Sequence, residues 1–372
     1  MNQQITHSNQ SATDISAVLN RGNLQAAVNI ISNLIDNQDY AKVAEGMELW
    51  LQQPKVLPGH LCLLYGFALN ALGRCDGALT AHKQAIVEHP GLANAKARKE
   101  STTIPNYDEY ESPCIGCGSN DSKLAYVCNQ SLSVNNFDVL NPIRVWKDCI
   151  DCGLTYTSNM PTAEALEKYY SANYLAQQPG GPLYNISEEG REQSYIKNSE
   201  TRLKVIEEIS GGKGRLIDVG AGRGTFVKVA QDKGWTAEGL EQLPENVAYA
   251  EKRWGLTLSQ MDFFDLDSQE AYDAITLFEV FEHLTRPWEA LKKCADMLSP
   301  KGVLVIAMPF RDSPYAKALH PAKDAWWSEP AHLIYIDTQC LAAKASEFGL
   351  HHVHTEEVEG AGRLDTYFTK VR

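Results

Sequence analysis

Two closely spaced cysteine pairs are the first residues in the sequence that could do chemistry. They read Cys114-Ile-Gly-Cys117 and Cys149-Ile-Asp-Cys152, and a glycine follows each pair. The two-residue gap lets both thiolates face one ion, and the glycine permits a tight turn that aims backbone amides at sulfur. Four thiolates suit tetrahedral zinc and leave no open coordination position. We therefore predict a structural zinc ribbon over residues 114–158.

Acidic and histidine side chains follow a strand that is predicted at Ala274–Phe278. Glu279, Glu282 and His283 have i, i+3, i+4 spacing, so one helical turn would place all three on one face. A further histidine, His332, lies in an aromatic run closer to the C-terminus. Imidazole titrates near neutrality, which suits it to removing a proton from an acceptor group.

A glycine-rich turn follows another predicted strand. The sequence Asp218-Val-Gly220-Ala-Gly222-Arg-Gly224 lets the main chain pass close to a ligand. Such a turn alone could equally hold a nicotinamide dinucleotide. However, Asp218 would repel a pyrophosphate, whereas it would attract the ammonium group of an amino-acid moiety.

Acidic positions farther along the chain favour an adenosyl ligand. Glu241 ends the next strand, about twenty residues on, where its carboxylate can accept both ribose hydroxyls. Asp262 offers an acceptor for the adenine amino group, and Phe263 beside it offers a ring for stacking. Together with Asp218, these residues argue against a dinucleotide.

Alternating strands and helices must position these side chains. Their spacing from residue 161 onward predicts an α/β domain with a parallel, doubly wound sheet and a site at the carboxyl ends of its strands. The expected strands of this sheet are Arg215–Val219, Thr236–Leu240, Ala274–Phe278 and Gly302–Met308, and those of the ribbon are Leu124–Val127 and Ile143–Trp146. The expected helices are Ala163–Tyr170, Glu192–Ile209, Phe226–Lys233, Glu245–Trp254 and Trp288–Leu298.

The N-terminal part of the chain has a helical pattern. After a disordered start at residues 1–13, residues 14–100 repeat Leu, Ala and Ile at helical spacing. The stretch Gly59–Leu92 fits the 34-residue tetratricopeptide template, so an all-α, tetratricopeptide-like repeat domain is expected, followed by a polar linker at residues 101–113. Two interpretations of this domain stay open, a docking groove for a protein partner and a helical cap that covers its neighbour.

Composition excludes several classes of protein. The 372 residues carry 34 basic and 47 acidic side chains, a net charge of −13, which argues against a nucleic-acid partner. No apolar run approaches about 18 residues, so no membrane span is predicted. The polar N-terminus lacks a signal-peptide pattern, and nine cysteines with two metal-type pairs indicate reduced thiols, hence a cytoplasmic protein.

The combined motifs resemble the class I S-adenosylmethionine-dependent methyltransferases, of the type 11/12-like group. The motifs that carry the resemblance are DVGAGRG, GLEQ, MDFFD, DAITLFEVFEHLTRP and LSPKGVLVIAMP. The resemblance implies a Rossmann-like methyltransferase domain at residues 159–372 with S-adenosyl-L-methionine as cofactor. The implied cofactor-binding residues are Asp218, Gly220, Ala221, Gly222, Glu241, Gln242, Asp262, Phe263 and Phe278.

The aromatic run around His332 resembles a segment of methyltransferases that pair this domain with a four-cysteine ribbon, including sugar C-methyltransferases. The resemblance implies that His332 is a general base, with His283 and Glu282 as further catalytic residues. The tyrosine and glutamate that accompany the histidine there are replaced here by Glu329 and Ala331. We therefore expect methyl transfer to an oxygen, rather than a carbon or nitrogen, of a small molecule or glycan precursor.

Three alternatives remain. The E-x-x-E-H pattern is also found in quinone O-methyltransferases and small-RNA 3′-end methyltransferases, where it binds a divalent cation. By that resemblance Glu279, Glu282, His283 and His332 would hold such an ion. RNA-directed methylation is the second alternative, and methylation of a carrier or peptide recruited by the helical repeats is the third.

Overall fold

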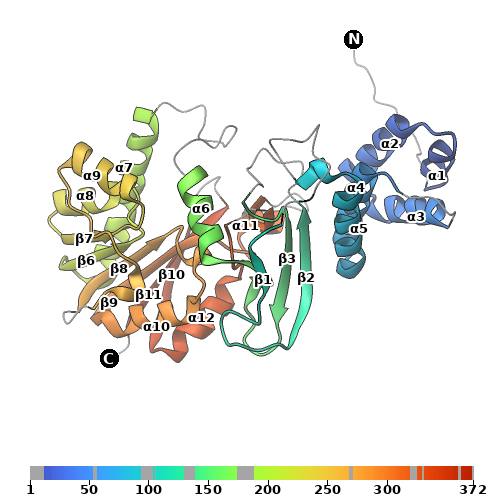
Figure 1. Ribbon diagram of the computed structural model, residues 1–372. Coiled ribbons are helices and arrows are strands. Elements are labelled where there is room, and N and C mark those ends of the chain that lie inside the picture. Colours follow the sequence, from blue (N-terminus) through green and yellow to red (C-terminus); the bar gives the residue numbers. More distant parts are fainter. Residues whose placement is uncertain are drawn as a thin grey trace, which may run out of the picture.

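The computed structural model describes the following ranges: 12–52, 57–93, 104, 106–129, 139–173, 188–267, 271–318, 325–328, 331–358 and 362–370. Three parts lie in a row (Figure 1). A helical module of α1–α5 forms one end, a module of short strands that carries the cysteine pairs lies in the middle, and an α/β domain forms the other end.

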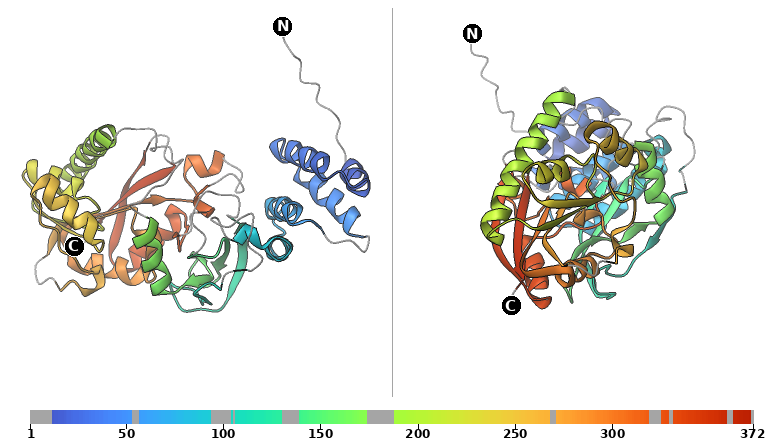
Figure 2. Two further views of the ribbon diagram at one scale, coloured as in Figure 1. Left: turned by 45° about the horizontal axis from the view of Figure 1, so that its top comes forward. Right: turned by 90° about the vertical axis from the view of Figure 1, so that its left-hand side faces the viewer.

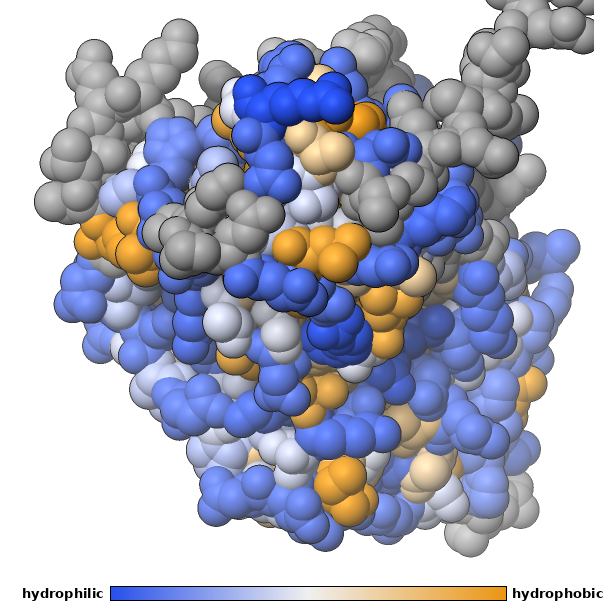
Figure 3. Space-filling model, turned by 90° about the vertical axis from the view of Figure 1, so that its right-hand side faces the viewer, coloured by the Kyte–Doolittle hydropathy of each residue, from blue (hydrophilic) through white to orange (hydrophobic). Residues whose placement is uncertain are grey.

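Within the described residues, the helical module contains five α-helices, followed by a short 3₁₀ helix at Pro90–Ala93. Its members are α1 (Ala12–Asn20), α2 (Leu24–Asp36), α3 (Tyr40–Leu51), α4 (Gly59–Ala71) and α5 (Cys75–Glu88). Helices α4 and α5 pack closely because Gly66 has no side chain, and a Cβ there would meet the His82 ring at 2.7 Å. Figure 3 looks onto this end of the molecule, where apolar side chains are scattered among hydrophilic ones.

Asn70 joins the helical module to the strands beside it. Its side-chain amide donates to the Val127 carbonyl and its oxygen accepts from the Val127 amide at 3.2 Å, so it pairs with strand β2 as another strand would. The Cys75 thiol donates to the Ala125 carbonyl of the same strand. The helices therefore pack against β2, and both interpretations of this domain, docking groove and cap, stay predictions.

The middle part, which we call the cysteine module (residues 106–161), contains two small sheets. Strands β2 (Ser122–Asn129), β3 (Ile143–Cys149) and β4 (Thr155–Thr157) form an antiparallel sheet in the order β2-β3-β4. Strand β1 (Glu109–Glu111) pairs with β5 (Asn159–Pro161). The predicted linker at 101–113 therefore contributes a strand, because its alternating polar residues pair with a segment some fifty residues later.

The α/β domain is built on a six-stranded sheet with the order β10-β11-β9-β8-β6-β7. Strands β7, β6, β8 and β9 run parallel, and β10 and β11 are antiparallel to their neighbours. The strands are β6 (Arg215–Val219), β7 (Thr236–Leu240), β8 (Tyr272–Phe278), β9 (Leu298–Pro309), β10 (Leu350–Val358) and β11 (Arg363–Lys370). The doubly wound prediction is thus confirmed, and the C-terminal hairpin β10–β11 is an addition to it.

Helices cover both faces of this sheet (Figures 1 and 2). They are α7 (Glu188–Ser210), α8 (Thr225–Asp232), α9 (Pro244–Trp254), α10 (Pro287–Met297) and α12 (Thr338–Glu347). Two further helices, α6 (Ala163–Asn173) and α11 (Pro314–Ala318), lie on the side of the domain that faces the cysteine module (Figure 1). Among the described residues, no helix combines the length and the apolar character needed to cross a membrane. The right-hand view of Figure 2 shows α7, α8 and α9 over the strands that carry the glycine turn.

Candidate active site

The glycine turn lies between β6 and α8, at the carboxyl end of β6. Gly220, Gly222 and Gly224 have φ values of 71°, 54° and 76°, a left-handed backbone that favours glycine. A Cβ at Gly222 would meet nothing within 4 Å, so there is open space over this residue. The Ala221 amide donates to the Leu240 carbonyl (2.7 Å), which fixes the turn against β7.

Glu241 closes the turn from the neighbouring strand. Its carboxylate accepts from the Gly222 amide at 2.7 Å and from the Leu243 amide at 2.8 Å. Burial raises the pKa of Glu241, and these backbone hydrogen bonds oppose the rise. The Asn246 side chain and the Gln242 amide also form hydrogen bonds with this carboxylate, which is therefore held in one place beside the turn.

Asp218 is buried beneath the turn. It is 3% exposed, and it accepts a hydrogen bond from the Thr276 hydroxyl of β8 at 2.6 Å. Burial raises the pKa of Asp218 to about 7, while this hydrogen bond and the charge of Arg202 oppose the rise. An acid with such a pKa responds to a nearby positive charge by losing its proton.

Arg202 of α7 is a charge at this site that sequence reasoning missed. Its guanidinium forms two hydrogen bonds with the Asp365 carboxylate, at 2.6 and 2.8 Å, and lies 4.1 Å from the centre of the Phe278 ring. Phe278 also meets Phe226 edge-on, with ring centres 4.8 Å apart. The only sequence signal for this arrangement is an arginine in the helix before β6.

The residues predicted to bind adenine have different surroundings. Asp262 is exposed, accepts from the Gln242 amide at 2.8 Å and caps a short 3₁₀ turn through the Phe264 amide. Phe263 is 4% exposed and belongs to the core beside the sheet. Its stacking on adenine stays a prediction. The half-buried Phe264, which sequence reasoning passed over, lies under the Arg286 guanidinium at 3.8 Å.

Glu279 departs from the predicted helical turn. Its φ is +57°, and the 3₁₀ turn that follows spans only Phe281–His283. Its carboxylate forms an ion pair with Arg363 of β11 (3.2 Å). The predicted helical turn through Glu279 therefore does not form. Among the described residues, Glu279 is not grouped with Glu282, His283 and His332, so its part in a cation site stays a prediction.

Glu282, His283 and His332 come together as predicted. One ligand atom from each lies within 4.8 Å of the other two, and the Nε2 of His332 is 3.9 Å from a carboxylate oxygen of Glu282. Burial lowers the pKa of His283 to about 4. The pKa of His332 is well below its ordinary value, because of burial and then the neighbouring charge of His283. Both rings are therefore neutral at pH 7, and each keeps one nitrogen lone pair.

Aromatic and backbone groups orient the two histidines. The Nδ1 of His283 donates to the Ala331 carbonyl at 2.9 Å, and the Tyr170 hydroxyl lies 3.1 Å from the same nitrogen. The His332 ring stacks on Trp326, with ring centres 5.7 Å apart and an interplanar angle of 12°.

Two further tyrosines, Tyr169 and Tyr195, do not belong to the group of Glu282, His283 and His332. Tyr169 is buried and contacts Tyr170 edge-on. Tyr195 is 52% exposed. Tyr174 and Glu329 lie outside the described residues.

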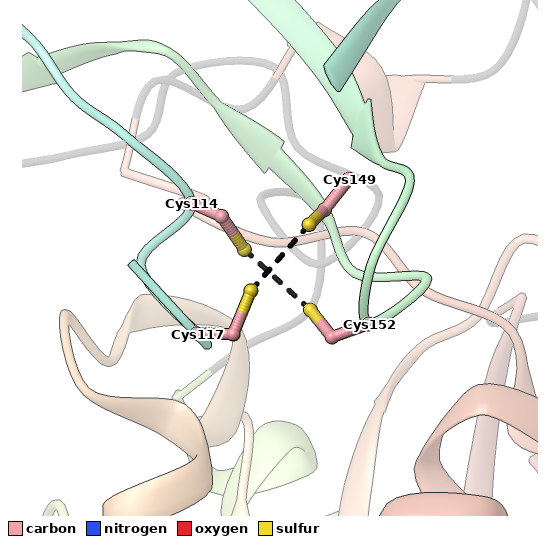
Figure 4. A group of neighbouring side chains, drawn as sticks. All are labelled: Cys114, Cys117, Cys149 and Cys152. Atoms are coloured by element: carbon pink, nitrogen blue, oxygen red, sulfur yellow. Dashed lines mark hydrogen bonds between the residues drawn. The ribbon is translucent and has the colours of Figure 1, made fainter. Parts of the chain in front are cut away.

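The four paired cysteines converge on one point of the cysteine module (Figure 4). The Sγ atoms of Cys114 and Cys152 are 3.6 Å apart, and those of Cys117 and Cys149 are 3.5 Å apart. Four thiolates around a tetrahedral zinc at about 2.3 Å would be about 3.8 Å apart. The donor set and its size therefore fit zinc. The pKa of the Cys152 thiol is lowered to about 5, and its hydrogen bond with Cys114 is the main cause.

Comparison with known proteins identifies part of the chain. Residues 191–355 match the family model described as "Methyltransferase domain". A ubiquinone biosynthesis O-methyltransferase of Rhodopseudomonas palustris is 26% identical over 98 residues, which are 25% of this chain and 39% of that protein. One of Histophilus somni is 24% identical over 169 residues, 36% of this chain and 71% of that protein. This chain thus spans about two fifths of the length of the first of these relatives.

Solved structures give a further comparison. The Streptomyces venezuelae protein DesVI matches with a TM-score of 0.41 and 19% identity, over 51% of this chain and 97% of that one. The magnesium protoporphyrin IX methyltransferase of Synechocystis, solved with bound SAM, matches with a TM-score of 0.38 and 11% identity, over 51% and 86%. Together with the family model and the curated relatives, the glycine turn shows that this chain contains a class I S-adenosylmethionine-dependent methyltransferase domain.

Proposed function

We propose that the protein transfers a methyl group from S-adenosylmethionine to an oxygen of a small molecule, with His332 as the base. The observation that carries the proposal is the group of Glu282, His283 and His332. Glu282 and His283 follow β8, and Val280 between them and the strand lies against Gly220 of the glycine turn. Relatives of the domain that are named O-methyltransferases support oxygen as the acceptor atom.

His332 is placed to take the proton of an acceptor hydroxyl. The cofactor, when bound, supplies an electrophilic methyl group on its sulfonium. His332 is neutral at pH 7 and becomes an imidazolium as it accepts the proton, and the Glu282 carboxylate 3.9 Å away stabilises that charge. The protein otherwise contributes alignment of the acceptor oxygen with the methyl group.

Methyl transfer can be tested with a labelled methyl donor and a panel of acceptors. Catechols stand for the quinone precursors named by the relatives, nucleotide sugars for glycan precursors, and a transfer RNA for nucleic acid. We expect label in an oxygen-linked methyl group of one small-molecule class. Label in RNA alone, or in a carbon-linked methyl group, would contradict the proposal.

A divalent cation at the same residues is the second candidate. Glu282, His283 and His332 offer one carboxylate and two imidazoles within 4.8 Å, and the Nδ1–H of His283 is held by a carbonyl, as in many metal-bound histidines. Such an ion would acidify the acceptor hydroxyl. Metal analysis separates the candidates: two ions per chain, one of them lost in Glu282→Gln, would favour the cation over the free base.

We further propose that the four cysteines hold a structural zinc ion. We expect one zinc per chain by elemental mass spectrometry. Cys117→Ser should lose the ion and lower the stability of the cysteine module by several kcal/mol, because binding a structural zinc contributes directly to the folding of the module that holds it. Cys75→Ser is the matched control, since its hydroxyl can keep the hydrogen bond to Ala125. Equal zinc content in both variants would contradict this prediction. A zinc site of thiolates also supports the cytoplasm as the compartment.

Cofactor affinity should depend on pH through Asp218. Because its pKa is about 7, Asp218 is mostly protonated at about pH 6, and a cationic ligand at the turn must displace that proton. We therefore expect S-adenosylmethionine to bind about five- to tenfold more tightly at about pH 7.5 than at about pH 6. Titration calorimetry checks this, and Asp218→Asn should flatten the dependence. The same slope in this variant would assign the effect to another group.

A further inference from the structure

The segment that follows His332 is bonded to the cysteine module. The Tyr335 amide donates to the Thr155 carbonyl at 3.1 Å, and the Thr157 amide donates to the Leu333 carbonyl at 2.9 Å. Tyr156 and Ile334 form an antiparallel bridge. Residues 333–335 thus extend the β2-β3-β4 sheet by one more short strand.

The same segment is bonded on its other side to the loop that carries Glu282 and His283. The amides of Leu333 and Ile334 both approach the Glu282 carbonyl, at 2.8 and 3.3 Å. Residues 333–335 therefore lie between strand β4 and the candidate catalytic loop. A shift of β4 would move the backbone next to His332 relative to Glu282.

A buried aromatic cluster strengthens this link. The Trp146 indole of β3 donates to the Trp327 carbonyl at 2.9 Å, and the two rings meet edge-on with centres 5.4 Å apart. Trp327 also packs against Tyr335 edge-on (4.8 Å). Its neighbour Trp326 stacks on His332, so both sides of the histidine are anchored to strands of the cysteine module.

The cysteine pairs close the turns at the ends of these strands. Cys149 is the last residue of β3, and Cys152 lies three residues before Thr155, the first residue of β4. The Cys149 amide donates to the Leu154 carbonyl (2.9 Å), so the metal-binding turn sets how β4 leaves β3.

We propose that the cysteine module is a positioning element of the active site. Trp146 and strand β4 hold His332 next to Glu282, and they do so only while the four cysteines bind their metal ion. The proposal deepens the function proposed above and rests on it for the role of His332. Its structural part concerns contacts within this chain, so it can be tested without knowing the acceptor.

Hydrogen–deuterium exchange of the full chain tests the backbone link. After the zinc is removed with a chelator, and its loss verified by elemental analysis, we expect the Tyr335 and Thr157 amides to exchange at least about tenfold faster. Ile217 in β6 should keep its protection, and S-adenosylhomocysteine should bind within about twofold as before. Unchanged protection of Tyr335, or equal loss of protection in Ile217, would overturn the proposal.

Trp146→Phe tests the side-chain link with the metal in place. Trp235→Phe is the matched control, because its indole is also buried and donates to Glu207 at 3.0 Å, in the core of the α/β domain. In NMR spectra of the ring protons, with the His332 signal assigned by His332→Gln, we expect that signal to shift or broaden in Trp146→Phe alone. A signal unchanged by Trp146→Phe, or changed equally by both variants, would overturn the proposal.

For the acceptor that turns over, Trp146→Phe should lower kcat about three- to tenfold without raising the KM for S-adenosylmethionine. A rise in that KM with unchanged kcat would overturn the positioning role. Absence of turnover in the wild type together with the expected NMR and exchange results would refute the proposed function but leave the backbone link intact.

Discussion

His332→Gln is expected to lower kcat by about 10²- to 10⁴-fold while cofactor affinity changes by no more than about twofold. The physical reason is that the imidazole is the neutral, buried group placed to accept the hydroxyl proton, and glutamine cannot take its place. Steady-state kinetics with the acceptor found in the panel, together with calorimetry of S-adenosylhomocysteine, measures both effects.

The pH profile adds a second expectation for His332. Because its pKa lies well below the ordinary value for histidine, the base stays unprotonated through neutral pH. The rate should be level there and fall only as the pH drops through the lowered pKa. Tyr195→Phe, on an exposed side chain, serves as the control and should leave the rate unchanged. Full activity in His332→Gln would remove this residue from the chemistry.

Glu241→Gln should weaken cofactor binding by about 10- to 100-fold. Its carboxylate is 7% exposed and already bonded to two backbone amides, so it is held in place to accept the ribose hydroxyls. A hydrogen bond to a charged group contributes about 1.5–3 kcal/mol, and the amide of glutamine offers one acceptor oxygen fewer and no charge. Calorimetry gives the dissociation constants.

Glu238→Gln is the matched control for that substitution, because Glu238 lies on the same strand but is bonded to Arg215 and Tyr272. Its cofactor affinity should equal that of the wild type. Thermal unfolding of both variants shows whether each is folded. Equal affinity in the Glu241 and Glu238 variants would rule out the proposed ribose contact.

The sequence predicts the parallel part of the sheet closely. Strands β6 and β7 have the predicted bounds. Each is a short segment flanked by glycine or polar residues, a pattern that is typical of a buried strand. Spacing placed Glu282 and His283 together, whereas His332 was added to them by resemblance. The distance between His332 and the other two residues along the chain gives no geometric signal.

Long-range contacts explain what the sequence could not predict. Glu279 has helical spacing to Glu282, yet its ion pair with Arg363 depends on hairpin β10–β11, which the sequence pattern did not reveal. Asp365 accepts a hydrogen bond from Arg202, although the two residues are 163 positions apart in the sequence. Phe263 and Phe264 are adjacent aromatic residues, and packing against the sheet alone decides which one is buried.

Calorimetric titration of the purified full chain with S-adenosylhomocysteine and with S-adenosylmethionine tests the central claim most directly. The turn at Gly222 with Glu241 beside it predicts one site per chain for each compound, weakened in Glu241→Gln. A folded protein that binds neither compound would contradict the assignment of this turn as the cofactor site.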